Sequence, residues 1–320
     1  MATADQLKTL IRAHLGDDTE RFFTTALQVA AHEASQGHTA LAHDIREIVD
    51  KARRTASSNV LLKFPQELAG LVFKETTEVP QSALILPDRL RLRIQRIIHE
   101  HRQQEKLKGF GLSNRRKILL AGPPGTGKTM TARVLAHELR MPLYTIQVDK
   151  LVTKFMGETS AKLRQIFDHI RDEPGVYLFD EFDAIGGERS RENDVGEMRR
   201  VLNSLLQFIE HDTSDSLIVA ATNNPRLLDR ALFRRFDDLL NYPSPDAAAR
   251  RRLMESMLGT FLPSKFSWPT SVKESRDLSH AEIVHAARDA IKDAILHDRK
   301  EVEPARFQQL LRDRREAHFR

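Results

Sequence analysis

A run of glycine, proline, lysine and threonine at residues 122–129 is the part of this sequence best suited to chemistry. It fills every position of the phosphate-binding pattern G-x-x-x-x-G-K-[ST]. The glycines let backbone N–H groups turn inward around a triphosphate, while the lysine offers a charge and the last threonine a hydroxyl for Mg²⁺. The segment therefore predicts a site for a nucleoside triphosphate with Mg²⁺. The predicted nucleotide-binding residues are Gly122, Pro123, Pro124, Gly125, Thr126, Gly127, Lys128, Thr129 and Met130.

Two adjacent carboxylates, Asp180 and Glu181, supply the second half of such a site. They follow the apolar run Val176–Phe179, which predicts a central strand that ends at this pair. Asp180 is expected to join Thr129 around Mg²⁺, and Glu181 is expected to activate the attacking water. When such a pair occurs alone, two solvated acids at a strand terminus are the alternative.

The neighbouring sequence supplies the elements that must position the phosphate-binding run. Lys117–Leu120 is a short, mainly apolar stretch that predicts a buried strand, and Met130–Arg140 has helical spacing without Pro or Gly. A helix that starts at a phosphate loop points the positive end of its dipole at the phosphates. The order of strand, loop and helix therefore supports the motif.

Together with Ala221–Pro225 and Leu228–Asp237, these motifs resemble an AAA ATPase over about residues 80 to 300. The resemblance implies that Asn223 senses the γ-phosphate and helps to orient water. It also implies that arginines just before Phe236 act as fingers on a neighbouring subunit's nucleotide, which requires a homo-oligomer, with a hexamer expected. The candidate catalytic residues are Lys128, Asp180, Glu181, Asn223, Arg234 and Arg235.

The two finger candidates are adjacent here, whereas many family members separate them by a short insertion. Arg235, directly before Phe236, is the stronger candidate, and the choice between it and Arg234 stays open. A basic loop with solvated arginines is the alternative for the pair.

Phe155, Met156 and Gly157 occupy the place of the family's central pore loop, whose pattern is aromatic, hydrophobic, glycine. At a pore, an aromatic ring and a flexible thioether can grip many different side chains. A small core contact is the alternative for these residues. The polar segment 186–194 resembles a second loop near the pore, and a plain solvated linker explains it nearly as well.

The composition of the chain limits the number of its domains and the classes of site it can contain. A chain of 320 residues with 40% hydrophobic content can form two or three packed domains. The absence of Cys excludes disulfides, thiolate zinc sites and cysteine nucleophiles. Apolar runs fall short of about 18 residues, so we expect no membrane segment and a cytoplasmic location.

The net charge of +5 is modest, but the segment Arg89–Lys117 concentrates ten Lys or Arg residues against two Glu residues. Such a cluster is compatible with a nucleic-acid face. We favour an amphipathic helix that docks on the core instead, because apolar residues recur at helical spacing and stacking aromatics do not interleave with the charges. The apolar positions are Leu90, Ile94, Ile97 and Ile98.

The expected fold is α/β: a P-loop NTPase αβα core with a five-stranded parallel sheet, a C-terminal helical lid and a small N-terminal helical domain. Residues 1–56 predict three short helices, which in AAA proteins usually recruit a substrate or adaptor, with a purely structural module as the alternative. Residues 57–80 predict a linker, 81–245 the ATPase core and 246–320 the lid.

Asp277–Val284 resembles the family's lid motif Ser-Gly-Ala-Asp-Leu. His280 replaces the usual Gly, which bears on how closely the backbone can approach the nucleotide. Ala281 stands where some related ATPase clades carry a second sensor arginine, which places the chain with the AAA proteins proper. A simple helix start capped by Ser279 explains the segment almost as well.

The resemblance favours a ring-forming ATP-driven motor that remodels, unfolds or translocates protein substrates or a partner protein. One alternative is a regulatory ATPase that assembles with and switches an effector enzyme such as a separate protease, by weak analogy in antiphage defence. The other is a nucleic-acid-associated ATPase, which rests on the Arg89–Lys117 segment and is less favoured. No membrane partner is expected.

Overall fold

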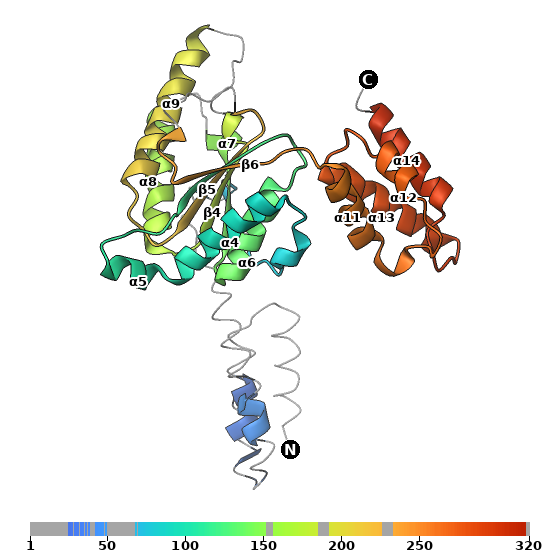
Figure 1. Cartoon of the computed structure of the whole chain (residues 1–320). Coiled ribbons are helices and arrows are strands. Elements are labelled where there is room, and N and C mark those ends of the chain that lie inside the picture. Colours follow the sequence, from blue (N-terminus) through green and yellow to red (C-terminus); the bar gives the residue numbers. More distant parts are fainter. Residues whose placement is uncertain are drawn as a thin grey trace. The chain divides into compact units, whose positions relative to one another are not determined.

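The computed structural model of this chain (Figure 1) divides it into two compact units, Met1–Gln66 and Glu67–Arg320. The predicted catalytic motifs all belong to the second unit. The described residues are 25–27, 29–31, 33, 34, 36, 38, 42–47, 49, 68, 70–151, 156–184, 192–225 and 233–317.

The first unit is mostly helical where it is described. Residues 25–27, 29–31 and 42–47 are helical. The apolar side chains of Ala26, Val29 and Ala30 are buried, as a small packed helical module requires. The first of the three predicted helical stretches, around Leu7, lies outside the described residues.

The second unit is built on a mostly parallel six-stranded sheet with the order β1-β3-β4-β5-β2-β6. Five strands run parallel, as predicted, and β1 pairs with β3 in the antiparallel direction. Because the parallel strands share one direction, their carboxyl ends meet at one edge, where the predicted motifs gather. The strands are β1 (Val72–Glu75), β2 (Lys117–Ala121), β3 (Leu143–Gln147), β4 (Val176–Asp180), β5 (Leu217–Thr222) and β6 (Asp238–Asn241).

Strand β1 lies within residues 57–80, the range predicted to be a linker. It has only four residues and occupies the sheet edge, with Phe73 47% exposed, so it lacks the continuous apolar pattern of the central strands. Leu71 and Val72 are buried nonetheless. This part of the range therefore belongs to the ATPase unit.

Helices cover both faces of the sheet, which confirms the αβα core. On one face, α4 (Asp88–Arg102) and α6 (Lys128–Leu139) pack together over a shared apolar cluster. On the other face, α8 (Met156–Asp172) packs against α9 (Glu192–His211), and Phe167 of α8 stacks on Phe179 of β4. The shorter elements are η2 (Gln81–Ala83), α5 (Gln104–Gly109), α7 (Val148–Leu151) and η3 (Phe182–Ala184).

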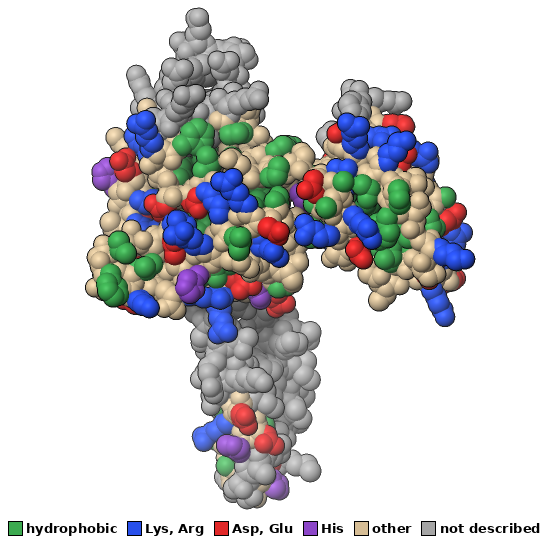
Figure 2. All heavy atoms as spheres, viewed as in Figure 1, with side chains coloured by type: hydrophobic (Ala, Val, Ile, Leu, Met, Phe, Trp, Pro, Cys, Tyr) green, Lys and Arg blue, Asp and Glu red, His purple; other side chains and the backbone are tan. Residues whose placement is uncertain are grey.

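The basic segment Arg89–Lys117 docks as an amphipathic helix, because Leu90, Ile94, Ile97 and Ile98 of α4 are all buried in the core. Most of its positive side chains form ion pairs within the chain. On the face shown in Figure 2, Lys and Arg side chains lie among Asp and Glu side chains. This arrangement weakens the case for a nucleic-acid surface. The pairs are Arg91–Asp88, Arg93–Asp238, Arg96–Glu100, Arg102–Glu138, Lys108–Glu105, Arg115–Glu100 and Arg116–Asp212.

The described residues after Pro245 form a helical lid with its own apolar core, which includes Met254, Ile283 and Phe307. Asp246 caps α11 by accepting a hydrogen bond from the Ala249 N–H. Ser279 and Glu282 form a capping box at the start of α13. The elements are α11 (Ala247–Leu258), η5 (Gly259–Phe261), α12 (Trp268–Glu274), α13 (His280–Leu296) and α14 (Pro304–Ala317).

Candidate nucleotide-binding and hydrolysis site

The predicted phosphate loop connects β2 to α6, and its glycines are required by close contacts and by left-handed backbone. A Cβ atom on Gly122 would lie 2.2 Å from the Tyr242 carbonyl oxygen. One on Gly125, where φ is +70°, would lie 2.6 Å from the Ser279 Oγ. Gly127 has a φ of 100° and sits at the N-cap of α6. The loop is therefore folded tightly against β6 and the lid, with the amino end of α6 open to an anion.

Lys128 is the buried cation of this loop. Its Nζ donates hydrogen bonds to the carbonyl oxygens of Gly122 at 2.7 Å and Pro123 at 2.8 Å. Burial lowers the pKa of the ammonium, and the nearby charges of Asp180 and Asp183 act in the opposite direction. A positive charge held in poorly solvated surroundings attracts phosphate more strongly than one in bulk water.

Thr129 and Asp180 come together from separate elements. The Thr129 hydroxyl, in the first turn of α6, donates to Asp180 Oδ2 at the end of β4 over 3.0 Å. A hydroxyl and a carboxylate beside a phosphate loop are the hard oxygen donors that Mg²⁺ prefers, with the substrate phosphates completing its coordination. No cluster of three or more His, Asp or Glu residues suited to a metal occurs among the described residues. The Thr129 hydroxyl and the Asp180 carboxylate fit Mg²⁺ that is bound together with a triphosphate.

Glu181 follows Asp180 in an unusual backbone conformation. Its φ is +52°, in the left-handed region that residues other than glycine rarely adopt. Its N–H donates to Asp180 Oδ1 at 3.0 Å, and its side chain is exposed along the cleft. Strain of this kind clusters at functional sites. Glu181 thus lines the cleft with an exposed side chain, while Asp180 accepts the hydrogen bond from Thr129.

Asn223 lies at the end of β5, where its N–H donates to Asp183 Oδ1 at 3.1 Å. Asp183 belongs to η3, the short turn after the paired acids. This bond ties the Asn223 segment to the Glu181 segment. Asp183 is a functional candidate that the sequence motifs did not single out, because its partner is 40 positions away and the contact is purely tertiary.

Replacing Asp183 by alanine is expected to lower ATP turnover by about tenfold while ATP affinity stays within about threefold, because the bond positions Asn223 without forming part of the phosphate cradle. Asp183→Asn keeps an acceptor oxygen and should recover most of the turnover. Steady-state hydrolysis and ATP titrations of both variants provide the measurement. Equal losses in the two variants would mean that the charge of Asp183, and not its acceptor oxygen, is what matters.

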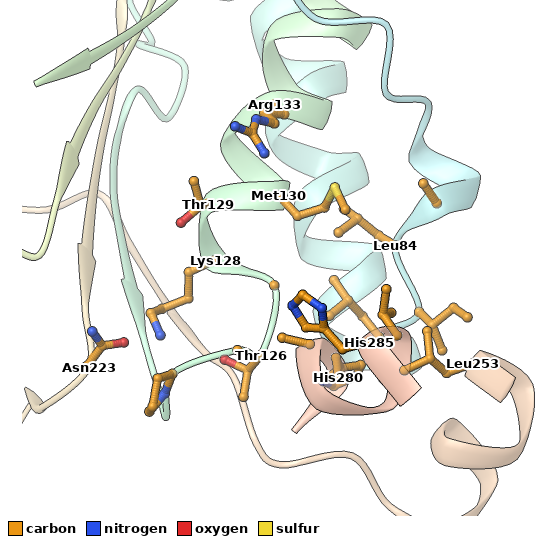
Figure 3. Close-up of a pocket in the computed structure, with 18 of the residues that line it drawn as sticks. Leu84, Thr126, Lys128, Thr129, Met130, Arg133, Asn223, Leu253, His280 and His285 are labelled. Carbon is orange, nitrogen blue, oxygen red and sulfur yellow. The ribbon is translucent and has the colours of Figure 1, made fainter. Parts of the chain in front are cut away.

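One cleft of about 560 Å³ is lined by Lys128, Thr129, Asp180, Glu181 and Asn223 (Figure 3). Lys128 and Asn223 lie toward one end, and His280, His285 and Leu253 lie toward the other. The Ala281 N–H donates to the Gly125 carbonyl at 3.0 Å, so the start of α13 rests directly on the phosphate loop. The cleft therefore offers a polar end for phosphates and a second end between the core and the lid.

The two finger candidates lie elsewhere on the core. Arg234 is exposed, and neither it nor Arg235 is among the residues that line the cleft. Arg235 Nη1 lies 3.2 Å from Glu210 Oε2. The Asp237 carboxylate accepts hydrogen bonds at 2.9 Å from the backbone N–H groups of Arg116 and Lys117, which anchors this loop to β2.

Some predicted positions fall outside the described part of the chain. Phe155 does, and so does most of the second loop, 186–194. Met156 and Gly157 are the first two residues of α8, and the side chain of Met156 lies outside the described features. Among the described helices, none combines the length and apolarity needed to cross a membrane.

A parallel sheet with a phosphate loop after β2 and paired acids after β4 defines a P-loop nucleoside triphosphatase. The model of the AAA family, the ATPase family associated with various cellular activities, matches residues 118–244. An AAA family ATPase of Sinorhizobium fredii, y4kL, is 34% identical over 98% of this chain and 96% of its own length. The chain therefore belongs to the AAA family, and it binds and hydrolyses ATP.

Two further relatives match over part of their length. A putative 26S proteasome regulatory subunit homolog of Methanothermobacter thermautotrophicus is 32% identical over 62% of this chain and 55% of its own length. The ATP-dependent zinc metalloprotease FtsH 1 of Methylacidiphilum infernorum is 33% identical over 61% of this chain and 32% of its own length. This chain thus spans about half of the former protein and a third of the latter.

Proposed function

We propose that this chain is the subunit of an ATP-driven ring, with a hexamer expected, that remodels protein substrates. The observation that carries the proposal is the position of the finger arginines. Arg234 and Arg235 lie outside the cleft of their own chain, so they are placed to act on the nucleotide of a neighbouring copy, where a guanidinium would stabilise charge on the transferring phosphoryl group. A closed ring of heterologous contacts gives every subunit such a neighbour.

In this proposal, Lys128 and the amino end of α6 hold the triphosphate, and Glu181 accepts a proton from the attacking water. Asn223 helps to orient that water beside the γ-phosphate. Thr129 and Asp180 would hold Mg²⁺, which neutralises phosphate charge when it is bound. The exposed Glu181 side chain suits its role because it faces the open cleft, where water is available.

The names of two relatives support a protein substrate. One is a homolog of a proteasome regulatory subunit and another is a metalloprotease, so both are named for protein breakdown. The metalloprotease also favours a second candidate function. The match covers only 32% of its length, so most of that protein lies outside the match. In that reading, this chain is a regulatory ATPase that assembles with and switches a separate effector such as a protease.

The substrate would be gripped by Phe155, Met156 and Gly157 at the pore and recruited by the helices of residues 1–56. Gly157 would allow the loop to move, while the aromatic ring supplies contact area without demanding one particular side chain. The buried Ala26, Val29 and Ala30 support a packed helical module as the recruiting part.

Phe155→Ala tests the protein-remodelling proposal. Basal ATP turnover should stay within about threefold of wild type, because Phe155 grips substrate and takes no part in the phosphate chemistry. Stimulation of turnover by an unfolded model protein, such as reduced carboxymethylated lactalbumin, should be lost. Phe155→Tyr keeps the aromatic ring and should retain the stimulation.

Two outcomes would count against this role of Phe155. If Phe155 packs in the core, its truncation should destabilise the fold by about 3 to 5 kcal/mol, which a thermal melt reveals. If wild-type turnover responds to DNA or RNA and ignores unfolded protein, with a steep loss of binding as salt rises, the enzyme is a nucleic-acid ATPase instead.

A further inference from the structure

Tyr242, the first residue after β6, is a buried tyrosine that contacts the start of the phosphate loop. Its N–H donates a hydrogen bond to the Ala121 carbonyl at 2.7 Å, at the end of β2. Its carbonyl oxygen and its Cβ lie so close to Gly122 that a Cβ atom added there would be within 2.8 Å of both. The backbone of Tyr242 therefore fixes the point at which the loop leaves β2.

The side chain of Tyr242 reaches the other end of the same loop through Thr131. The Tyr242 hydroxyl donates to Thr131 Oγ1 at 2.7 Å, and the Thr131 hydroxyl donates in turn to the Gly127 carbonyl at 3.0 Å. Both side chains are buried, so each bond is electrostatically stronger than it would be in water. Burial also raises the pKa of the Tyr242 hydroxyl, which therefore stays protonated and able to donate. One tyrosine is thus joined to the first and the last glycine of the loop.

The direction of the Gly127 carbonyl determines where the neighbouring N–H points. The peptide between Gly127 and Lys128 is trans, so its carbonyl and its N–H point in opposite directions. The carbonyl points into α6, where it accepts from the N–H and the hydroxyl of Thr131 at 2.9 and 3.0 Å. The Lys128 N–H therefore points out of the amino end of α6, which is the side from which a phosphate approaches.

We propose that Tyr242 is a positioning residue for ATP binding, whose hydroxyl acts through Thr131 to fix the peptide before Lys128 so that its N–H is ready to bind a phosphate oxygen. Fixing this peptide matters because Gly127, with a φ of 100°, has more conformational freedom than any other residue type would have. Each bond that holds its carbonyl reduces the entropy lost when the phosphates order the loop. The inference rests on ATP binding alone and is independent of what the ring acts on.

Tyr242→Phe removes the hydroxyl and keeps the ring. It should weaken ATP binding by about fivefold and raise KM by a similar factor, while kcat stays within about twofold, because the loop holds the ground state and the transition state alike. Thr131→Val interrupts the same two bonds from the other side and should give a similar loss, which also covers the case that Tyr242→Phe is too unstable to titrate. Thr131→Ser keeps the hydroxyl and should bind ATP like wild type. Titrations with ATP in the absence of Mg²⁺ measure the affinities without hydrolysis, and steady-state kinetics give KM and kcat.

Tyr177→Phe is the matched control, because a buried tyrosine hydroxyl needs a partner for the stability of the fold alone. Tyr177 is a buried residue of β4 whose hydroxyl donates to the Glu173 carbonyl at 2.7 Å, and it does not line the cleft. Its loss should lower the melting temperature about as much as Tyr242→Phe does and leave ATP affinity within about twofold of wild type. Wild-type ATP affinity in Tyr242→Phe and Thr131→Val, with lowered melting temperatures, would show a merely structural role and overturn the proposal. An equal loss of ATP affinity in Tyr177→Phe would overturn it as well.

Discussion

Glu181→Gln is expected to bind ATP with an affinity within about threefold of wild type and to lose at least about 100-fold in turnover. Glutamine matches the shape of Glu181 and keeps its left-handed turn at φ +52°, but it cannot accept a proton from water. Binding should survive because the phosphate contacts come from Lys128 and the amino end of α6. ATP titration and single-turnover hydrolysis measure the two effects separately.

Lys128→Ala provides the contrast, since it removes a buried charge from the phosphate loop itself. It should weaken ATP binding by at least about 100-fold, and its turnover should fall as a consequence. Because Glu181→Gln keeps ATP bound, it should also enrich the ring in sedimentation or mass-photometry measurements, whereas Lys128→Ala should not. Near-normal turnover by purified Glu181→Gln would remove Glu181 as the base.

The phosphate-side residues could be predicted from sequence because they depend on local features. The loop after β2 is continuous in sequence, and Asp180 and Glu181 follow directly from the buried strand β4. A Cβ atom added to Gly125 would clash with Ser279, which explains why the motif has glycine there. Ser279 is far away in the sequence, so only the folded structure brings the two residues together. The local sequence pattern therefore predicts phosphate binding and hydrolysis, and the tertiary structure explains why glycine is needed at its position in the loop.

Strand β1 and two contacts between distant segments could not be predicted from the sequence. Strand β1 is short and half exposed at a sheet edge, so it resembles a linker in sequence. The bond from Asn223 to Asp183 and the ion pair between Arg235 and Glu210 both cross between elements. Neither contact has a periodic signature, since each depends on where separate elements end in space.

Arg235→Ala should keep near-normal nucleotide affinity and lose turnover by about 1000-fold, as expected when a finger acting on a neighbour's phosphate is removed. Its ion pair with Glu210 does not oppose this role. Arg235 is 30% exposed and Glu210 is 55% exposed, and a pair so accessible to water contributes only about 0 to 1 kcal/mol. The guanidinium can therefore exchange the carboxylate for a phosphate when a neighbour docks.

The matched control is Arg234→Ala, which removes the exposed neighbour of Arg235 and should lower turnover much less. If Arg234→Ala suffers the larger loss, the roles of the two arginines are exchanged. Glu210→Gln should leave turnover within about threefold, since it only frees Arg235 from its partner within the chain.

Mixing Arg235→Ala with Glu181→Gln tests whether the finger acts between subunits. Each variant alone has a defect at every interface of its ring. In a randomly mixed ring at equal amounts, about a quarter of the interfaces join an intact Glu181 to an intact Arg235 from the next subunit. Turnover should therefore recover to a measurable fraction of wild type, far above either variant alone. If rings shown by mass measurements to contain both variants recover no activity at any ratio, Arg235 does not act in trans.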